Sequence, residues 1–138
     1  MKRKISLILV LTMILVAVLQ FSLLASDISL CNNNTVRTTS YFAISDTGNA
    51  TVRLGYEVYS NVTTGATINI TIEKRNLLLF WSDVVSETIT VSGIRYSNEL
   101  TYQLDDTGTY RCTVEYVVSG TGGADDVITF EDTKTYSN

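Results

Sequence analysis

The chain has 138 residues and a formal net charge of −4 at pH 7, and it contains two cysteines but neither histidine nor proline. Without histidine, a Ser-His-Asp triad, a Cys-His dyad and every histidine-ligated metal site are excluded. An acidic chain without a basic stripe is a poor match to nucleic acid. We therefore expect no nucleic-acid partner, no cofactor, no metal and no enzymatic activity.

Residues 1–25 have the layout of a secretory signal peptide. Basic residues at 2–4 precede a long apolar run that begins at Ile5, and small residues follow at Ala25 and Ser26. This pattern predicts cleavage after one of these two small residues and a secreted, extracellular protein. Because the apolar run is about twenty residues long, enough to span a bilayer, the alternative is an uncleaved anchor that holds the domain outside the cell.

Cleavage leaves a more acidic chain that is long enough for one domain. It removes three of the ten basic residues and none of the fourteen acidic ones, so the formal charge goes from −4 to −7. About 113 residues remain, enough for a single core and too few for two. Residues 26–39 hold three consecutive asparagines and few large apolar side chains, which predicts a flexible N-terminal arm. Residues 40–138 then form the domain.

The rest of the chain has the pattern of short strands separated by turn residues, with no helical period. The clearest strand has Ile68, Ile70 and Ile72 alternating with polar residues, as in a strand with one face in a core. The expected strands span 40–45, 50–58, 68–73, 77–81, 84–91, 96–104, 110–118 and 127–136. Seven or eight such strands without crossover helices predict an all-β antiparallel sandwich.

One motif gives a more specific expectation. Asp106-x-Gly108-x-Tyr110-x-Cys112 leads into an alternating strand that runs to Val118. The motif resembles the entry to strand F of immunoglobulin-like domains, where the tyrosine ties its hydroxyl to the backbone a few residues upstream, the tyrosine corner. The resemblance implies an immunoglobulin-like sandwich of seven to eight strands in which these four motif residues are structural.

The chain departs from that family at its cysteines and its tryptophan. Leu54 or a neighbour occupies the place of the family's first cysteine, and Trp81 comes too late to be its core tryptophan. Export favours a disulfide between Cys31 and Cys112, whereas the topology disfavours it, because the arm would have to cross the sandwich. The alternative is that Cys112 is simply a small apolar core residue.

The apolar run from Leu77 to Trp81 has two interpretations. A short continuous apolar run is typical of a strand covered on both faces, so we expect a place in the core. The alternative is an exposed binding ledge formed by Leu77, Leu79, Phe80 and Trp81, since a large exposed apolar patch implies a partner.

Several neighbouring acids carry oxygen ligands of the kind that Ca²⁺ prefers. They lie at 105–106, 125–126 and 131–132, and none has the spacing of a calcium loop. We expect solvated loop acids instead. An acid-only hydrolase is the catalytic alternative, although nothing in the sequence sets two carboxylates a sugar's width apart.

The whole chain also resembles small secreted β-sandwich proteins of Gram-positive bacteria. The shared features are the signal, an Ile-x-Ile-x-Ile-Glu-Lys strand, a Gly-Thr-Tyr-Arg strand start and a glycine-rich final hairpin; they identify no functional residues. The sequence therefore predicts a secreted, non-catalytic binding or cell-surface module whose partner is an extracellular protein or glycan. Two alternatives are a small toxin or bacteriocin-like protein, and a membrane-anchored extracellular domain that meets the membrane only through its uncleaved N-terminal segment.

Overall fold

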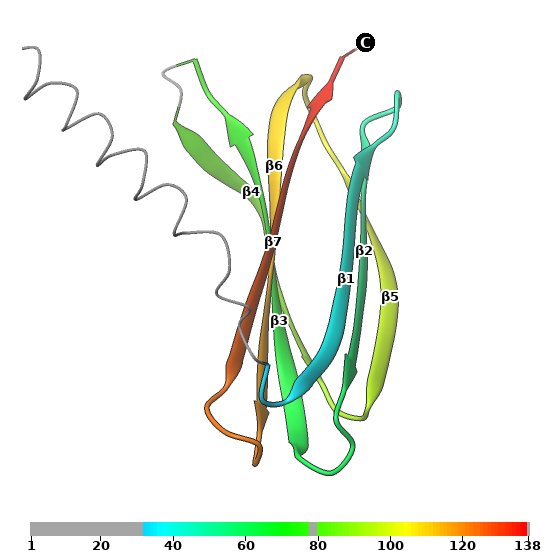
Figure 1. Ribbon diagram of the computed structural model, residues 1–138. Coiled ribbons are helices and arrows are strands. Elements are labelled where there is room, and N and C mark those ends of the chain that lie inside the picture. Colours follow the sequence, from blue (N-terminus) through cyan, green and yellow to red (C-terminus); the bar gives the residue numbers. More distant parts are fainter. Residues whose placement is uncertain (1–31, 78–79, 138) are drawn as a thin grey trace, which may run out of the picture. The chain divides into compact units, whose positions relative to one another are not determined.

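The computed structural model describes residues 32–77 and 80–137, and the expected signal peptide lies outside them. They form a β-sandwich of two antiparallel sheets (Figure 1), which confirms the all-β expectation. The seven strands are β1 (Thr35–Ile44), β2 (Asn49–Val58), β3 (Thr63–Arg75), β4 (Trp81–Val91), β5 (Arg95–Gln103), β6 (Gly108–Gly120) and β7 (Asp126–Tyr136). One sheet has the order β1-β2-β5 and the other the order β4-β3-β6-β7.

The core lies between the sheets and comes mainly from alternate residues of β2, β3 and β6. The three isoleucines of β3 are fully buried, as their alternation predicted. The other buried apolar residues are Phe42, Ala50, Val52, Leu54, Tyr56, Val58, Ala66, Leu104, Tyr110, Cys112, Val114, Tyr116 and Val118. The edge strands β4 and β5 contribute only partly buried side chains, such as Val85 and Leu100. The centre of each sheet therefore supplies most of the apolar burial that stabilises the fold.

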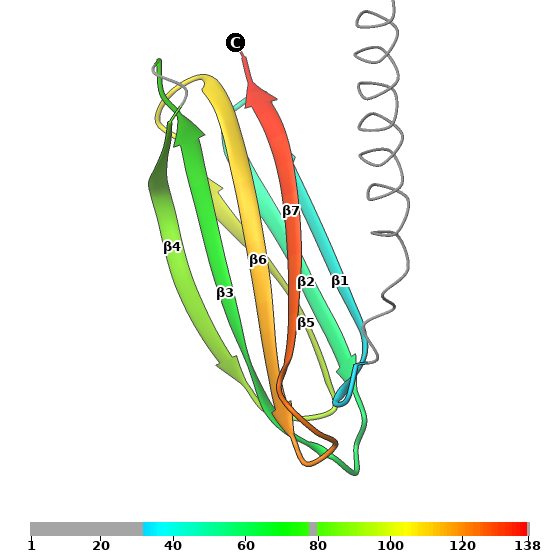
Figure 2. The same cartoon turned by 60° about the vertical axis from the view of Figure 1, so that its left-hand side comes forward.

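The loops gather at the two ends of the sandwich. The β1–β2 turn, the β3–β4 turn, the β5–β6 connection and the last residues of β7 lie at one end (Figure 2), and the start of β1 and the β6–β7 loop lie at the other. The β1–β2 turn closes with the amide of Gly48 donating to the carbonyl oxygen of Ser45 at 3.0 Å. Gly48 has a φ of 77°, a left-handed conformation that favours glycine.

The first strand begins at Thr35, so the expectation of a flexible arm through residue 39 is wrong. The Asp126 carboxylate, where β7 begins, accepts the backbone N–H groups of Asn33, Asn34 and Thr35 at 2.7, 2.8 and 2.8 Å. The buried Asn34 side chain donates to the carbonyl oxygens of Val118 and Ala124. We call Asp126 and these three backbone amides the Asp126 clamp; it fixes the start of β1 against the β6–β7 loop.

The glycine-rich β6–β7 loop makes this close approach sterically feasible. A Cβ atom added at Gly120 would lie 2.2 Å from the carbonyl oxygen of Val62, and one added at Gly122 would lie 2.3 Å from that of Asn33. Both distances are shorter than any van der Waals contact. Gly122 therefore admits the residues that precede β1, and Gly120 admits both the Asn34 side chain, 2.4 Å from the added Cβ atom, and the β2–β3 connection.

The tyrosine-corner contact is present at the start of β6. Tyr110 is buried, and its hydroxyl donates to the carbonyl oxygen of Asp106 at 2.5 Å. The Asp106 side chain in turn pairs with Lys74 of β3 at 3.1 Å. These contacts attach the β5–β6 connection to the end of β3.

Candidate functional site

The turn between β3 and β4 places apolar side chains in solvent. Leu77 is fully exposed and Phe80 is 66 % exposed. The turn is closed by the amide of Asn76 donating to the carbonyl oxygen of Phe80 at 2.9 Å, and by the amide of Phe80 donating to Oδ1 of Asn76 at 3.1 Å. The core interpretation is therefore wrong for these two apolar residues, which lie at a hairpin tip instead of in an eighth strand. Leu79 lies outside the described residues.

Trp81 lies beside this turn but is partly covered. It begins β4 opposite Arg75, and the Arg111 guanidinium lies 4.5 Å from the centre of its ring. Arg111 is itself held by Glu73, with Nε and Nη2 at 2.8 and 2.6 Å from Oε2. A cation over the face of a tryptophan is an attractive arrangement, so Trp81 packs against the outer face of the sheet rather than pointing freely into solvent like Phe80.

A hollow of about 700 Å³ lies between this turn and the start of β6. Its lining is Lys74, Arg75, Asn76, Leu77, Ser82, Val84, Thr107, Gly108 and Thr109. Ligand sites are typically concave, mostly apolar, and have a few polar groups that fix orientation. The hollow and the exposed Leu77 and Phe80 together form what we call the β3–β4 tip.

The acids weighed as calcium ligands do not come together. In the described part of the chain, no group of three or more aspartate, glutamate or cysteine side chains is placed to hold a metal ion. The sequence predicted a solvated loop acid at position 126, and this prediction is wrong. Asp126 is buried and accepts three backbone hydrogen bonds. Burial raises the pKa of its carboxyl, but these hydrogen bonds outweigh burial, and the pKa lies below its usual value.

Cys112 is a fully buried, free thiol in the middle of β6. Burial raises the pKa of this thiol to about 12. A protonated, inaccessible thiol is a poor nucleophile, so Cys112 serves as a small apolar core residue. Its candidate disulfide partner, Cys31, lies outside the described residues, and that pairing stays a prediction.

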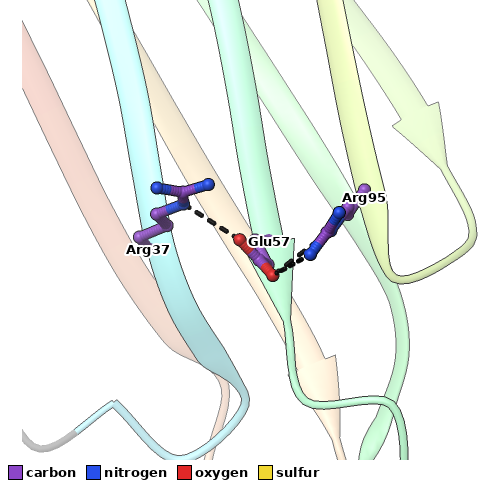
Figure 3. Close-up of polar contacts among 3 residues, drawn as sticks. All are labelled: Arg37, Glu57 and Arg95. Carbon is purple, nitrogen blue, oxygen red and sulfur yellow. Dashed lines mark hydrogen bonds and ion pairs between the residues drawn. The ribbon is translucent and has the colours of Figure 1, made fainter.

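The sequence analysis missed a charged cluster on the outer face of the three-stranded sheet. Arg37, Glu57 and Arg95 stand side by side on β1, β2 and β5 (Figure 3), as the strand register requires. Arg37 Nε lies 3.0 Å from Glu57 Oε2, and Arg95 Nη2 lies 2.7 Å from Glu57 Oε1. The hydrogen bond from Arg95 lowers the pKa of the Glu57 carboxyl. Nothing in the local sequence marks these residues, because their proximity depends on a register that alternation alone does not specify.

Comparison with known proteins gives no relative. No protein-family model matches the chain, and neither the curated proteins nor the solved structures contain a match. Among residues 32–77 and 80–137 there is no helix that is both long enough and apolar enough to cross a membrane.

Proposed function

We propose that this protein is a secreted, non-catalytic binding module with an immunoglobulin-like fold. The strand order supports that fold, since β1-β2-β5 faces β4-β3-β6-β7 and the chain changes sheets after β2, β4 and β5. The hydroxyl of Tyr110 on the carbonyl oxygen of Asp106 is a second supporting feature. Sandwiches of this kind present loops from a rigid scaffold, which suits recognition rather than catalysis.

The proposed recognition surface is the β3–β4 tip. The observation that carries this proposal is the exposure of Leu77 and Phe80 on one tight turn beside an apolar hollow. A large exposed apolar side chain costs free energy in water, and adjacent ones commonly mark a contact site. The partner would be an extracellular protein or glycan that presents an apolar face, such as the face of a sugar ring. The signal-like segment at 1–25 supports an extracellular location, and the same domain held by an uncleaved segment is the alternative.

A membrane-active role is the second candidate. Arg75 precedes the exposed turn directly, so a basic side chain lies with the apolar ones at one end of the sandwich, whereas the neighbouring Lys74 is paired with Asp106. This combination suits contact with anionic lipid, where apolar groups enter the interface and basic groups meet the headgroups. A toxin or bacteriocin-like activity would use the same surface.

One set of variants tests both candidates. The purified protein, Phe80→Ser and Val127→Ser are applied to glycan arrays, to immobilised extracellular proteins and to dye-loaded vesicles of neutral or anionic lipid. Val127 is the matched control, since it is 55 % exposed and lies at the start of β7, at the opposite end of the sandwich. We expect Phe80→Ser to lose binding at least tenfold, with Val127→Ser unchanged. Dye release that depends on Phe80 would select the membrane-active role. Equal binding by all three proteins would refute the tip as the recognition surface.

A further inference from the structure

The outer face of the three-stranded sheet has a depression of about 330 Å³, remote from the β3–β4 tip. Gly55 of β2 forms its floor, with Thr39 of β1 on one side and Ser97 of β5 on the other. Glycine in the interior of a central strand weakens the sheet and often marks a place where another group comes close to the backbone. A Cβ atom added at Gly55 would lie 2.7 Å from Thr39 Oγ1, so any side chain there would fill the depression.

A side chain from the opposite sheet contacts the backbone beneath this floor. Tyr116 of β6 crosses the core, and its hydroxyl accepts the amide hydrogen of Gly55 at 3.3 Å and donates to the carbonyl oxygen of Thr39 at 3.0 Å. Gly55 and Thr39 are register partners in a continuous stretch of the β1–β2 ladder, so the hydroxyl contacts both strands at this pair from the core side. This hydrogen-bond bridge therefore fixes the backbone of the floor from the core side, and the missing side chain of Gly55 leaves the space above it.

Two arginines form one rim of the depression, and Glu57 fixes the position of both (Figure 3). Arg37 uses its Nε for Glu57, while Arg95 uses Nε and Nη2. A guanidinium carries five N–H donors. Within the described part of the chain the remaining donors of both arginines meet no acceptor. The hydroxyls of Thr39 and Ser97 add two further polar groups at the same rim.

The charge of the rim selects the class of ligand. Two arginines and one glutamate leave a single positive charge, which one monovalent anion would neutralise and a divalent anion would overcompensate. Guanidinium groups match carboxylates in geometry, and the hydroxyls suit a ligand with hydroxyls of its own. We propose that this depression binds a hydroxylated monocarboxylate of about the size of a monosaccharide, the chemistry of a uronic acid. This site is separate from the β3–β4 tip and does not depend on the function proposed for it.

The test is an NMR titration of the ¹⁵N-labelled protein at about pH 8 with sodium glucuronate, with glucose as the neutral counterpart and inorganic phosphate, mainly divalent at this pH, as the divalent anion. We expect saturable shifts at the amides of Thr39, Gly55 and Ser97 with glucuronate, and at least tenfold weaker binding of glucose and phosphate. Arg95→Gln should weaken glucuronate binding about tenfold, since it removes charged hydrogen bonds to the ligand.

Two further variants keep the result interpretable. Gly55→Ala fills the floor while it leaves both arginines in place, and it should also abolish the shifts. Arg53→Gln is the matched control, because Arg53 lies on the same face of the sheet and pairs with Glu99 outside the depression. Thermal unfolding checks that each variant is folded. The proposal is overturned if glucuronate produces no saturable shifts, if phosphate binds as well as glucuronate, or if Arg53→Gln weakens binding as much as Arg95→Gln.

Discussion

Replacement of Asp126 by asparagine should destabilise the fold far more than a surface substitution would. Oδ1 of Asp126 accepts the amide of Asn33, and Oδ2 accepts the amides of Asn34 and Thr35. An asparagine side chain of the same shape has only one acceptor oxygen, so its NH₂ group would face at least one backbone N–H. The substitution therefore removes one charged hydrogen bond and makes the other two neutral.

The magnitude follows from these three contacts. A hydrogen bond to a charged group contributes roughly 1.5–3 kcal/mol and a neutral one roughly 0.5–1.5 kcal/mol. One lost bond and two weakened ones would together cost about 5 kcal/mol. A neutral amide is less costly to bury than a carboxylate, which offsets part of this loss. The net decrease in the free energy of unfolding should be about 3 kcal/mol, a large share of the roughly 5–15 kcal/mol typical of a domain. For a domain of this size the melting temperature should fall by roughly 12–24 °C.

Urea denaturation followed by the fluorescence of Trp81, the single tryptophan of the chain, measures this loss. Asp125→Asn is the matched control, because Asp125 precedes the Asp126 clamp directly and is exposed. The pKa of Asp126 is depressed in the folded protein, so its contribution is present above the unfolded pKa of about 4 and is lost as pH falls through the folded value. The difference between wild type and Asp126→Asn should accordingly shrink in acid. A difference below about 0.5 kcal/mol at pH 7, within the usual range for surface substitutions, would refute the role given to the clamp.

Three further experiments test the hydrogen bond of Tyr110, the burial of the Cys112 thiol and the close packing at Gly120. Tyr110→Phe removes the hydrogen bond to the carbonyl oxygen of Asp106 and should lower the free energy of unfolding by about 1–2 kcal/mol in urea denaturation. The Cys112 thiol, with its pKa raised to about 12, should resist alkylation at pH 8 until denaturant is added; rapid labelling of Cys112 in the native protein, distinguished from labelling of Cys31 by peptide mass, would contradict its burial. Gly120→Ala sets a Cβ atom against the carbonyl oxygen of Val62 and should cost about 2 kcal/mol by calorimetry, whereas an unchanged melting temperature would show that the loop relaxes freely.

Most of the fold could be predicted from the alternation of apolar and polar residues along the strands. The isoleucines of β3 and the stretch of β6 from Tyr110 to Val118 are buried at alternate positions, as a period of two requires. The start of β1 was missed because its anchor is Asp126, about ninety residues away in the sequence. The sequence around Thr35 does not indicate that a distant carboxylate accepts hydrogen bonds from the backbone of residues 33–35. The run of asparagines, taken alone, predicts a loop.

The candidate sites were harder to predict because they depend on where strands end and how they pair. The run that begins at Leu77 is apolar enough to be a buried strand, and only the closure of the turn between Asn76 and Phe80 places these two apolar residues, Leu77 and Phe80, in solvent. The cluster around Glu57 requires the register of three strands, two of them far apart in the sequence. Composition and periodicity contain neither kind of information.

Site-specific photo-crosslinking tests the central claim most directly. The protein would carry p-benzoylphenylalanine in place of Phe80 or, as the control, in place of Val127, and each form would be irradiated under native conditions on the cells that make it. Both positions are exposed, at opposite ends of the sandwich, so they differ in surroundings rather than in accessibility. If the β3–β4 tip is the recognition surface, a discrete adduct forms from position 80 and not from position 127. Adducts from position 127 alone, or from neither position, would contradict the account.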